Sequence, residues 1–162
     1  AVARRAQGFA MPILYVDTSD HPAIENELSA KRVPLTQLLE HADVVSLHVP
    51  LNETTAGLIG PGEFELMKPH AILVNAARGA VVDTDALLTA LKTGQIGYAA
   101  LDVTDPEPLP HTHELYQLPN ALILPHIGSA TRSARNQMSL LAVDNLIAGL
   151  QGDPLPKAVY QP

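Results

Sequence analysis

The stretch "AILVNAARGAVVDTDALLTALKTGQIGYAALDV", residues 71–103, contains two short apolar runs separated by a helical pattern. The runs 71–76 and 98–103 are typical of strands buried on both faces, as in parallel sheets. Residues 83–94 open with Asp and Thr, place three leucines on one helical face and stop at Gly94. The stretch therefore predicts a strand, a helix and a second strand in succession.

The same alternation extends outward in both directions. Further apolar runs that indicate strands are 12–16, 43–49 and 121–125. Helical patterns cover 35–42, 62–67 and about 131–150, the last with a broad apolar face. Five strands that alternate with helices predict an α/β fold with a Rossmann-type, doubly wound parallel sheet.

Composition limits the classes of partner. The chain has 162 residues, 46% of them hydrophobic, with ten basic and seventeen acidic residues and no cysteine. A net charge of −7 disfavours nucleic acid and anionic membranes, because both attract a basic surface. The absence of cysteine fits a reducing compartment, and no apolar run is long enough to span a bilayer. We expect a cytoplasmic globular protein without nucleic-acid or membrane partners.

Polar and charged residues follow the predicted strands. In open α/β sheets, ligands bind beyond the carboxyl ends of the strands. The positions that follow the five apolar runs are Asp17, Pro50, the segment 75–79, Asp102 and His126. Two carboxylates, a guanidinium and an imidazole at one edge predict a ligand site there.

Asp17 directly follows the apolar run "ILYV". An acid at this point of a dinucleotide-binding fold accepts hydrogen bonds from the adenosine ribose and repels a 2′-phosphate. The alternative is an Asp that only starts the turn "DTSDHP". Such an acid lies about 20 residues after a G-x-G-x-x-G loop, and counting back from Asp17 passes Ala1. We therefore expect the first strand and the glycine loop to be missing, with "AVARRAQG" as the helix that follows them.

Three further residues are candidates for catalysis. Arg78 in "NAARGAVVD" could bind a carboxylate through two parallel hydrogen bonds, or form a surface ion pair. Glu107 in "DPEPLP" could orient His126 and favour its imidazolium, which would then donate a proton, or be an exposed loop acid. His111 and His113 have a spacing compatible with a metal pair, but without cysteine we predict no metal site.

The chain resembles the D-isomer-specific 2-hydroxyacid dehydrogenases over essentially its whole length. The resemblance rests on "ADVVSLHVPLNETTAGLIG", "MKPHAILVNAARGAVVDTDALLTAL", "AALDVTDPEPLP" and "LPNALILPHIGSATRSARNQM". Within that family it is most similar to the glyoxylate/hydroxypyruvate reductases, through "LDVTDPEPLP", "LILPHIGSAT" and "MSLLAVDNLIAGLQGDPLP".

The resemblance implies a role for each matching residue. Arg78 would bind the substrate carboxylate, Glu107 would be the acid of a dyad, and His126 would be the general acid/base. The implied cofactor-binding residues are Asp17, Pro50, Thr55, Ala76, Ala77, Arg78, Asp102, His126, Ile127, Gly128 and Ser129.

The resemblance also implies the organisation and activity of the protein. Residues 1–150 would be a NAD-binding domain without its N-terminal strand and glycine loop, and 151–162 would begin the return to a substrate domain. The implied reaction is NAD(P)H-dependent reduction of glyoxylate or hydroxypyruvate to a D-2-hydroxy acid by a homodimer. NADH is expected over NADPH because of Asp17, and this piece alone is expected to be inactive. Phosphoglycerate or D-lactate dehydrogenases and NAD-sensing corepressors are the alternatives.

Overall fold

The computed structural model describes residues 1–158 of the chain. They divide into two compact units, Ala1–Pro125 and a second that begins at His126. From the sequence we expected a NAD-binding domain over 1–150 and a return segment over 151–162, of which 159–162 lie outside the described residues. This division remains a prediction about the complete protein.

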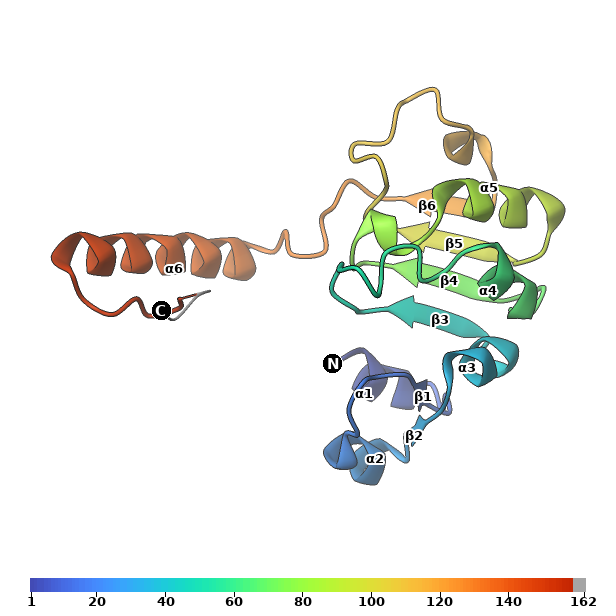
Figure 1. Cartoon of the computed structure of the whole chain (residues 1–162), viewed down its shortest axis with the longest axis horizontal. Helices are drawn as coiled ribbons and strands as arrows, with labels where there is room; N and C mark the ends of the chain where they lie inside the picture. The colour runs from blue at the N-terminus through green and yellow to red at the C-terminus, as the bar shows by residue number, and fades with distance from the viewer. Residues whose placement is uncertain (159–162) are drawn as a thin grey trace. The chain divides into compact units, whose positions relative to one another are not determined.

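The larger unit contains a four-stranded parallel sheet (Figure 1). Its strands are β3 (Val44–Leu47), β4 (Ile72–Asn75), β5 (Tyr98–Leu101) and β6 (Ala121–Ile123), adjacent in that order. Leu47 pairs with Asn75, and Asn75 with Leu101. The carboxyl ends of these three strands are therefore level, so the loops that follow them emerge at one edge. The parallel α/β architecture predicted from the sequence is confirmed.

A second sheet consists of two short parallel strands, β1 (Leu14–Tyr15) and β2 (Lys31–Arg32). Among the described residues it does not join the four-stranded sheet, so there are two sheets where the sequence indicated one. Strand β2 was not predicted, because two basic residues show no apolar run. It forms because the main-chain N–H of Lys31 donates to Ile13 O at 2.9 Å and that of Val33 to Tyr15 O at 3.0 Å.

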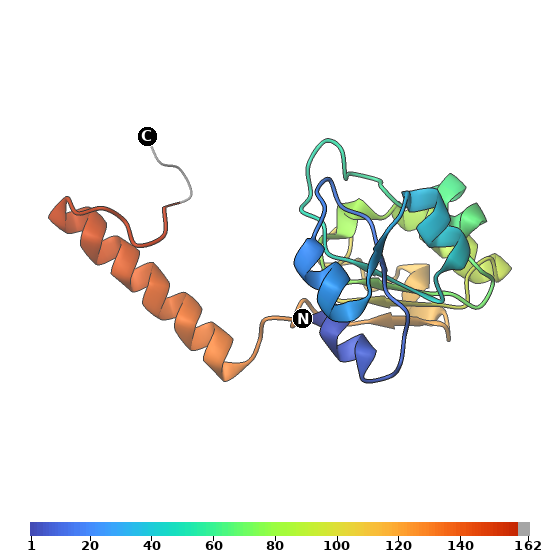
Figure 2. The ribbon, with the colours of Figure 1, turned by 90° about the horizontal axis from the view of Figure 1, so that it is seen from below.

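Except for α2, which was not predicted, the helices of this unit follow the sequence pattern closely. They are α1 (Val2–Gln7), α2 (Pro22–Leu28), α3 (Leu35–His41), α4 (Pro61–Leu66) and α5 (Thr84–Thr93), with short 3-10 turns η1 (Gly79–Val81) and η2 (Glu114–Gln117). Helix α5 starts where the Asp83 side chain accepts from Ala86 N at 2.9 Å, and it ends at Gly94 with φ of 71°. The two views show α3, α4 and α5 on one face of the four-stranded sheet (Figures 1 and 2).

The core lies between this sheet face and the helices. It includes the fully buried Leu39 of α3, Phe64 of α4 and Leu73 of β4. Side chains on the opposite face are exposed, among them Tyr98 at 57% and Leu122 at 56%. Within this unit, α3, α4 and α5 therefore bury the strands on one face, and burial of the other face stays a prediction.

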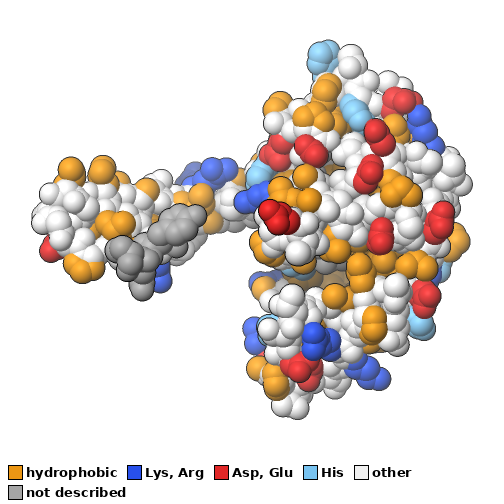
Figure 3. All heavy atoms as spheres, in the orientation of Figure 1, with side chains coloured by type: hydrophobic (Ala, Val, Ile, Leu, Met, Phe, Trp, Pro, Cys, Tyr) orange, Lys and Arg blue, Asp and Glu red, His pale blue; other side chains and the backbone are white. Residues whose placement is uncertain are grey.

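The second unit consists mainly of α6 (Arg132–Gln151). Thr131 caps its start by accepting from Ala134 N at 3.1 Å, and Gly152 ends it with φ of 75°. None of its residues is buried, and hydrophobic side chains lie along its exposed surface (Figure 3). Within residues 1–158, no helix is long and apolar enough to cross a membrane.

Candidate cofactor and active site

A buried asparagine shapes the turn that carries Arg78. Asn75 ends β4 and is 1% exposed. Its Nδ2 donates to Arg78 O at 2.9 Å, and its Oδ1 accepts from Ala77 N at 3.0 Å. The amide thus spans the turn and fixes the backbone of the predicted site residues Ala76, Ala77 and Arg78. The sequence placed Asn75 in the segment 75–79 at this edge but gave it no role of its own.

Gly79 brings this turn into contact with the loop that carries Glu107. A Cβ atom at position 79 would lie 2.0 Å from Thr104 O and 2.6 Å from Asp105 N. Only a residue without a side chain allows the two backbones to approach so closely. The Thr84 hydroxyl fastens the same loop by donating to Asp105 O at 2.8 Å. The segments that carry Arg78 and Glu107 are therefore held side by side.

The predicted residues at this edge are accessible. Arg78 and Glu107 are exposed, and Asp102 is half-buried. Arg78 Nη1 donates to Ala77 O at 2.6 Å, while the main-chain N–H of Asp102 donates to Asn75 O at 2.8 Å. The structure therefore places Asp102 beside the end of β4, at the same edge as Arg78.

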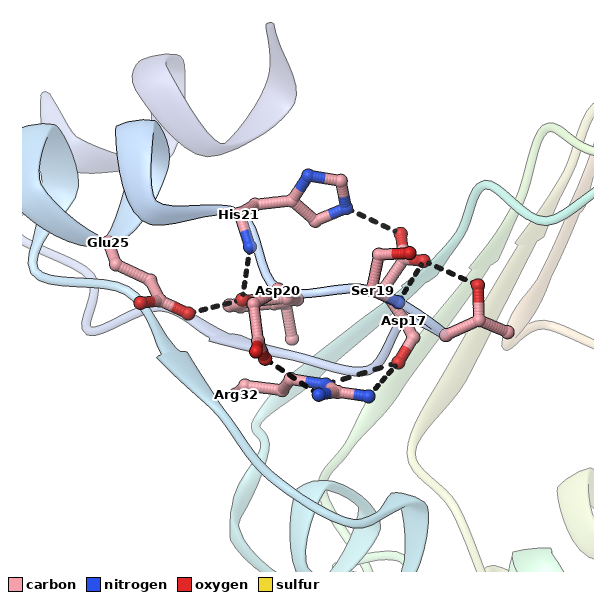
Figure 4. A network of polar contacts seen from close by, with 8 residues as sticks. Asp17, Ser19, Asp20, His21, Glu25 and Arg32 are labelled. Carbon is pink, nitrogen blue, oxygen red and sulfur yellow. Dashed lines mark hydrogen bonds and ion pairs between the residues drawn. The ribbon is translucent and has the colours of Figure 1, made fainter.

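Asp17 lies two residues after the end of β1, in a network of local hydrogen bonds (Figure 4). Its Oδ2 is 2.9 Å from His21 Nε2, and its Oδ1 accepts from Ser19 N at 3.2 Å. These two contacts, the His21 contact first, lower the pKa of the Asp17 carboxyl below its ordinary value. An exposed carboxylate that stays ionised can accept further hydrogen bonds from the two hydroxyls of a ribose, so the residue fits the predicted role.

An arginine distant in sequence lies beside Asp17. Arg32 of β2 donates from Nη2 to Asp17 O at 2.8 Å and from Nη1 to Asp20 Oδ1 at 2.6 Å. Arg32 was not among the residues predicted from the sequence. No local motif indicates it, since only the pairing of β1 with β2 makes the two positions neighbours.

Pro50 and Thr55 lie in one loop after β3. The Thr55 hydroxyl donates to Pro50 O, and it also accepts from Asn52 N at 2.9 Å. The Asn52 side chain in turn accepts from Thr55 N at 3.1 Å. The structure thus joins the two predicted residues through the Thr55 side chain, which shapes the loop.

The predicted residues His126, Ile127, Gly128 and Ser129 begin the second unit, and all four are exposed. His126 has φ of 53°, in the left-handed region. Residues with a side chain are uncommon in that region, although histidine tolerates it better than most. Backbone conformations of this kind cluster at functional sites.

Residues 1–158 contain no cluster of three or more His, Asp or Glu side chains that could hold a metal ion. Instead, His113 caps η2, since its Nδ1 accepts from Leu115 N at 3.2 Å.

The chain matches known proteins along most of its length. Residues 1–128 match the family model described as the D-isomer specific 2-hydroxyacid dehydrogenase, NAD binding domain. The glyoxylate reductase of Thermococcus litoralis is 48% identical over 159 residues, which are 98% of this chain and 48% of that protein. The glyoxylate/hydroxypyruvate reductase B of Escherichia fergusonii is 50% identical over 94% of this chain and 48% of that protein. The chain thus spans about half the length of these curated relatives.

A solved structure shares the same fold. The crystal structure of D-lactate dehydrogenase with NAD+ from Lactobacillus jensenii has a TM-score of 0.88 and 30% sequence identity. The alignment covers 99% of this chain and 52% of that one. The Rossmann-type fold and a nicotinamide cofactor are thereby supported.

Gly79→Ala should lower the free energy of unfolding by about 3 kcal/mol or more, because the added methyl group meets the Thr104 backbone. Gly62→Ala is the matched control. Gly62 lies in α4 with open space around it, so alanine there should stabilise by about 0.5–1 kcal/mol. Urea unfolding of both variants tests this, and an unchanged midpoint for Gly79→Ala would contradict the close approach.

His21→Ala should raise the pKa of the Asp17 carboxyl toward about 3.9, since the ring contact is the largest cause that lowers it. A carboxyl whose pKa is lower in the folded than in the unfolded state stabilises the protein at pH values above the unfolded-state pKa. This stabilisation is lost as the pH falls through the folded-state pKa. The variant should therefore lose less stability than the parent on acidification. Carboxyl NMR titration measures the pKa, with His41→Ala as the control because the His41 ring contacts Gln37 O instead. An unmoved Asp17 titration would contradict the assignment.

Proposed function

The chain belongs to the D-isomer-specific 2-hydroxyacid dehydrogenase family, and we propose that its protein reduces glyoxylate or hydroxypyruvate to the D-2-hydroxy acid with a nicotinamide cofactor. The names of its relatives support these substrates. The observation that carries the proposal is the packing of Gly79 on Thr104. It joins the segments of Arg78 and Glu107 at the sheet edge where α/β folds bind ligands.

Each catalytic residue has a proposed task. Arg78 binds the carboxylate of the 2-oxo acid, since a guanidinium matches a carboxylate with two parallel hydrogen bonds. His126 donates a proton to the keto oxygen, and Glu107 orients the imidazole ring and stabilises its protonated form. The nicotinamide, when bound, supplies the hydride to the keto carbon.

Asp17 supports NADH as the preferred cofactor. Its ionised carboxylate can accept hydrogen bonds from both ribose hydroxyls of NADH, whereas it repels the 2′-phosphate of NADPH. Pro50 and Thr55 would line the adenosine and phosphate side. Ala76, Ala77, Asp102 and the run His126 to Ser129 would border the nicotinamide.

The complete protein is proposed to contain a further strand with a glycine loop and to form a homodimer. Strands β1 and β3 each pair with a strand on one side only among the described residues. This supports the predicted further strand with its glycine loop, which would add a phosphate-binding segment. A homodimer in the cytoplasm is proposed from the family resemblance.

The complete protein should oxidise NADH when glyoxylate or hydroxypyruvate is added, with a lower rate for NADPH. Absorbance at the nicotinamide band follows the reaction, and pyruvate and 3-phosphohydroxypyruvate test the related dehydrogenase activities. Binding of NADH without turnover of any 2-oxo acid would favour a cofactor-sensing protein and contradict the proposal.

His126→Gln should lower kcat by about 10² to 10⁴-fold with little change in the KM for NADH, because a general acid acts on the reacting oxygen. Glu107→Gln should also lower kcat. If the two side chains act as a pair, the double variant should be hardly slower than His126→Gln alone. His41→Gln, which contacts Gln37 O, is the control. Turnover near the parent's in His126→Gln, or multiplicative losses in the double variant, would refute the pair.

A further inference from the structure

Arg32 makes three hydrogen bonds at the proposed ribose site (Figure 4). Its Nε and Nη2 donate to the main-chain carbonyl of Asp17 at 3.2 and 2.8 Å. Its Nη1 donates to Asp20 Oδ1 at 2.6 Å. The guanidinium therefore contacts the backbone of Asp17 and the carboxylate of Asp20, while the Asp17 carboxylate contacts His21 instead.

These residues line an open hollow beside the end of β1. Its volume is about 540 Å³, and its lining residues are Val16, Asp17, Asp20, Arg32, Val33 and Pro34. Arg32 and Asp20 are both accessible to solvent, with side chains 40% and 67% exposed. A ligand group next to Asp17 would therefore meet a guanidinium that is already occupied by a carboxylate.

We propose that the ion pair between Asp20 and Arg32 sets the cofactor preference, by withholding the guanidinium from the 2′-phosphate of NADPH. This inference rests on the proposed nicotinamide site at Asp17. An arginine near the ribose acid is the group that accommodates a 2′-phosphate in dinucleotide-binding folds. Here Asp20 neutralises that arginine and engages one of its amino groups.

The same contacts give Arg32 a positioning task toward NADH. Two of its donors bind the carbonyl of Asp17, so they hold the backbone from which the ribose-binding carboxylate extends. Arg32 thus favours NADH binding by holding the Asp17 main chain. Its ion pair with Asp20 keeps its positive charge from binding the 2′-phosphate of NADPH. An exposed ion pair contributes little to stability, so variants of the pair should fold.

The test measures kcat/KM for NADH and NADPH in the complete protein, and also the Kd of each cofactor by calorimetry without a 2-oxo acid, whose ratio should change in the same direction. Asp20→Asn should raise the ratio of NADPH to NADH efficiency on the order of tenfold, because an uncompensated guanidinium attracts phosphate. Arg32→Gln added to Asp20→Asn should abolish that gain. Arg32→Gln alone should raise the KM for NADH several-fold, through the loosened Asp17 backbone, without a comparable loss of kcat.

Glu27→Gln is the matched control. Glu27 forms a comparable exposed ion pair, with 2.6 Å between Arg4 Nε and its Oε1, and it does not line the hollow. Its substitution removes one negative charge, as Asp20→Asn does, and should leave the efficiency ratio unchanged. A general effect of net charge on NADPH binding would raise the ratio in both variants and overturn the inference.

Asp17→Ala distinguishes a failure of the ion-pair role from a failure of the cofactor site. If Asp17→Ala raises the ratio but Asp20→Asn does not, the cofactor site stands and the role of the ion pair is refuted. If the gain of Asp20→Asn persists without Arg32, loss of repulsion explains it and the role of Arg32 is refuted. If Asp17→Ala changes neither the KM for NADH nor that for NADPH, the proposed cofactor site fails and the inference fails with it.

Discussion

The contact between Gly79 and the Thr104 backbone is the constraint on which the candidate active site depends. The Gly79 and Thr104 backbones lie so close that a Cβ atom at position 79 has no room. The loops that follow β4 and β5 are therefore packed against each other. Asn75 acts on the other side of the same turn, where its buried amide hydrogen-bonds to the main chain of Ala77 and Arg78. A buried amide left without these partners would destabilise the protein, so the turn is held in one conformation. The Arg78 side chain is exposed, yet its backbone is held by the Asn75 amide and by the packing of Gly79 on Thr104.

The Asp17 site is organised differently. It depends on exposed polar contacts rather than on close backbone packing, and its residues come from the loop after β1 and from β2. The His21 contact lowers the pKa of the Asp17 carboxyl, and Arg32 holds the main chain of Asp17. Exposed contacts of this kind add little stability, and they leave the charge pattern beside the ribose position open to change by single substitutions. Rigid packing therefore supports the proposed catalytic edge, whereas charge arrangement governs the proposed cofactor edge.

Much of the fold was predictable where a strong local signal coincides with the packing. Helix α5 was expected from Asp83 to Gly94 and spans Thr84–Thr93, because a side-chain cap and a glycine stop act within one helical turn. The four strands of the larger sheet fall inside their predicted apolar runs. By contrast, α2 and β2 were missed. Strand β2 comprises a lysine and an arginine, both exposed, so its pairing with β1 leaves no hydrophobic pattern.

The sequence by itself determined the parallel α/β class, the family and the positions where functional side chains follow the strands. Short-range periodicity and capping encode these features, and both act between residues a few positions apart. Only the tertiary structure decided which of those positions meet. Gly79 against Thr104 and Arg32 against Asp17 join residues 25 and 15 positions apart. Such contacts depend on strand pairing and backbone separation, which no local pattern specifies.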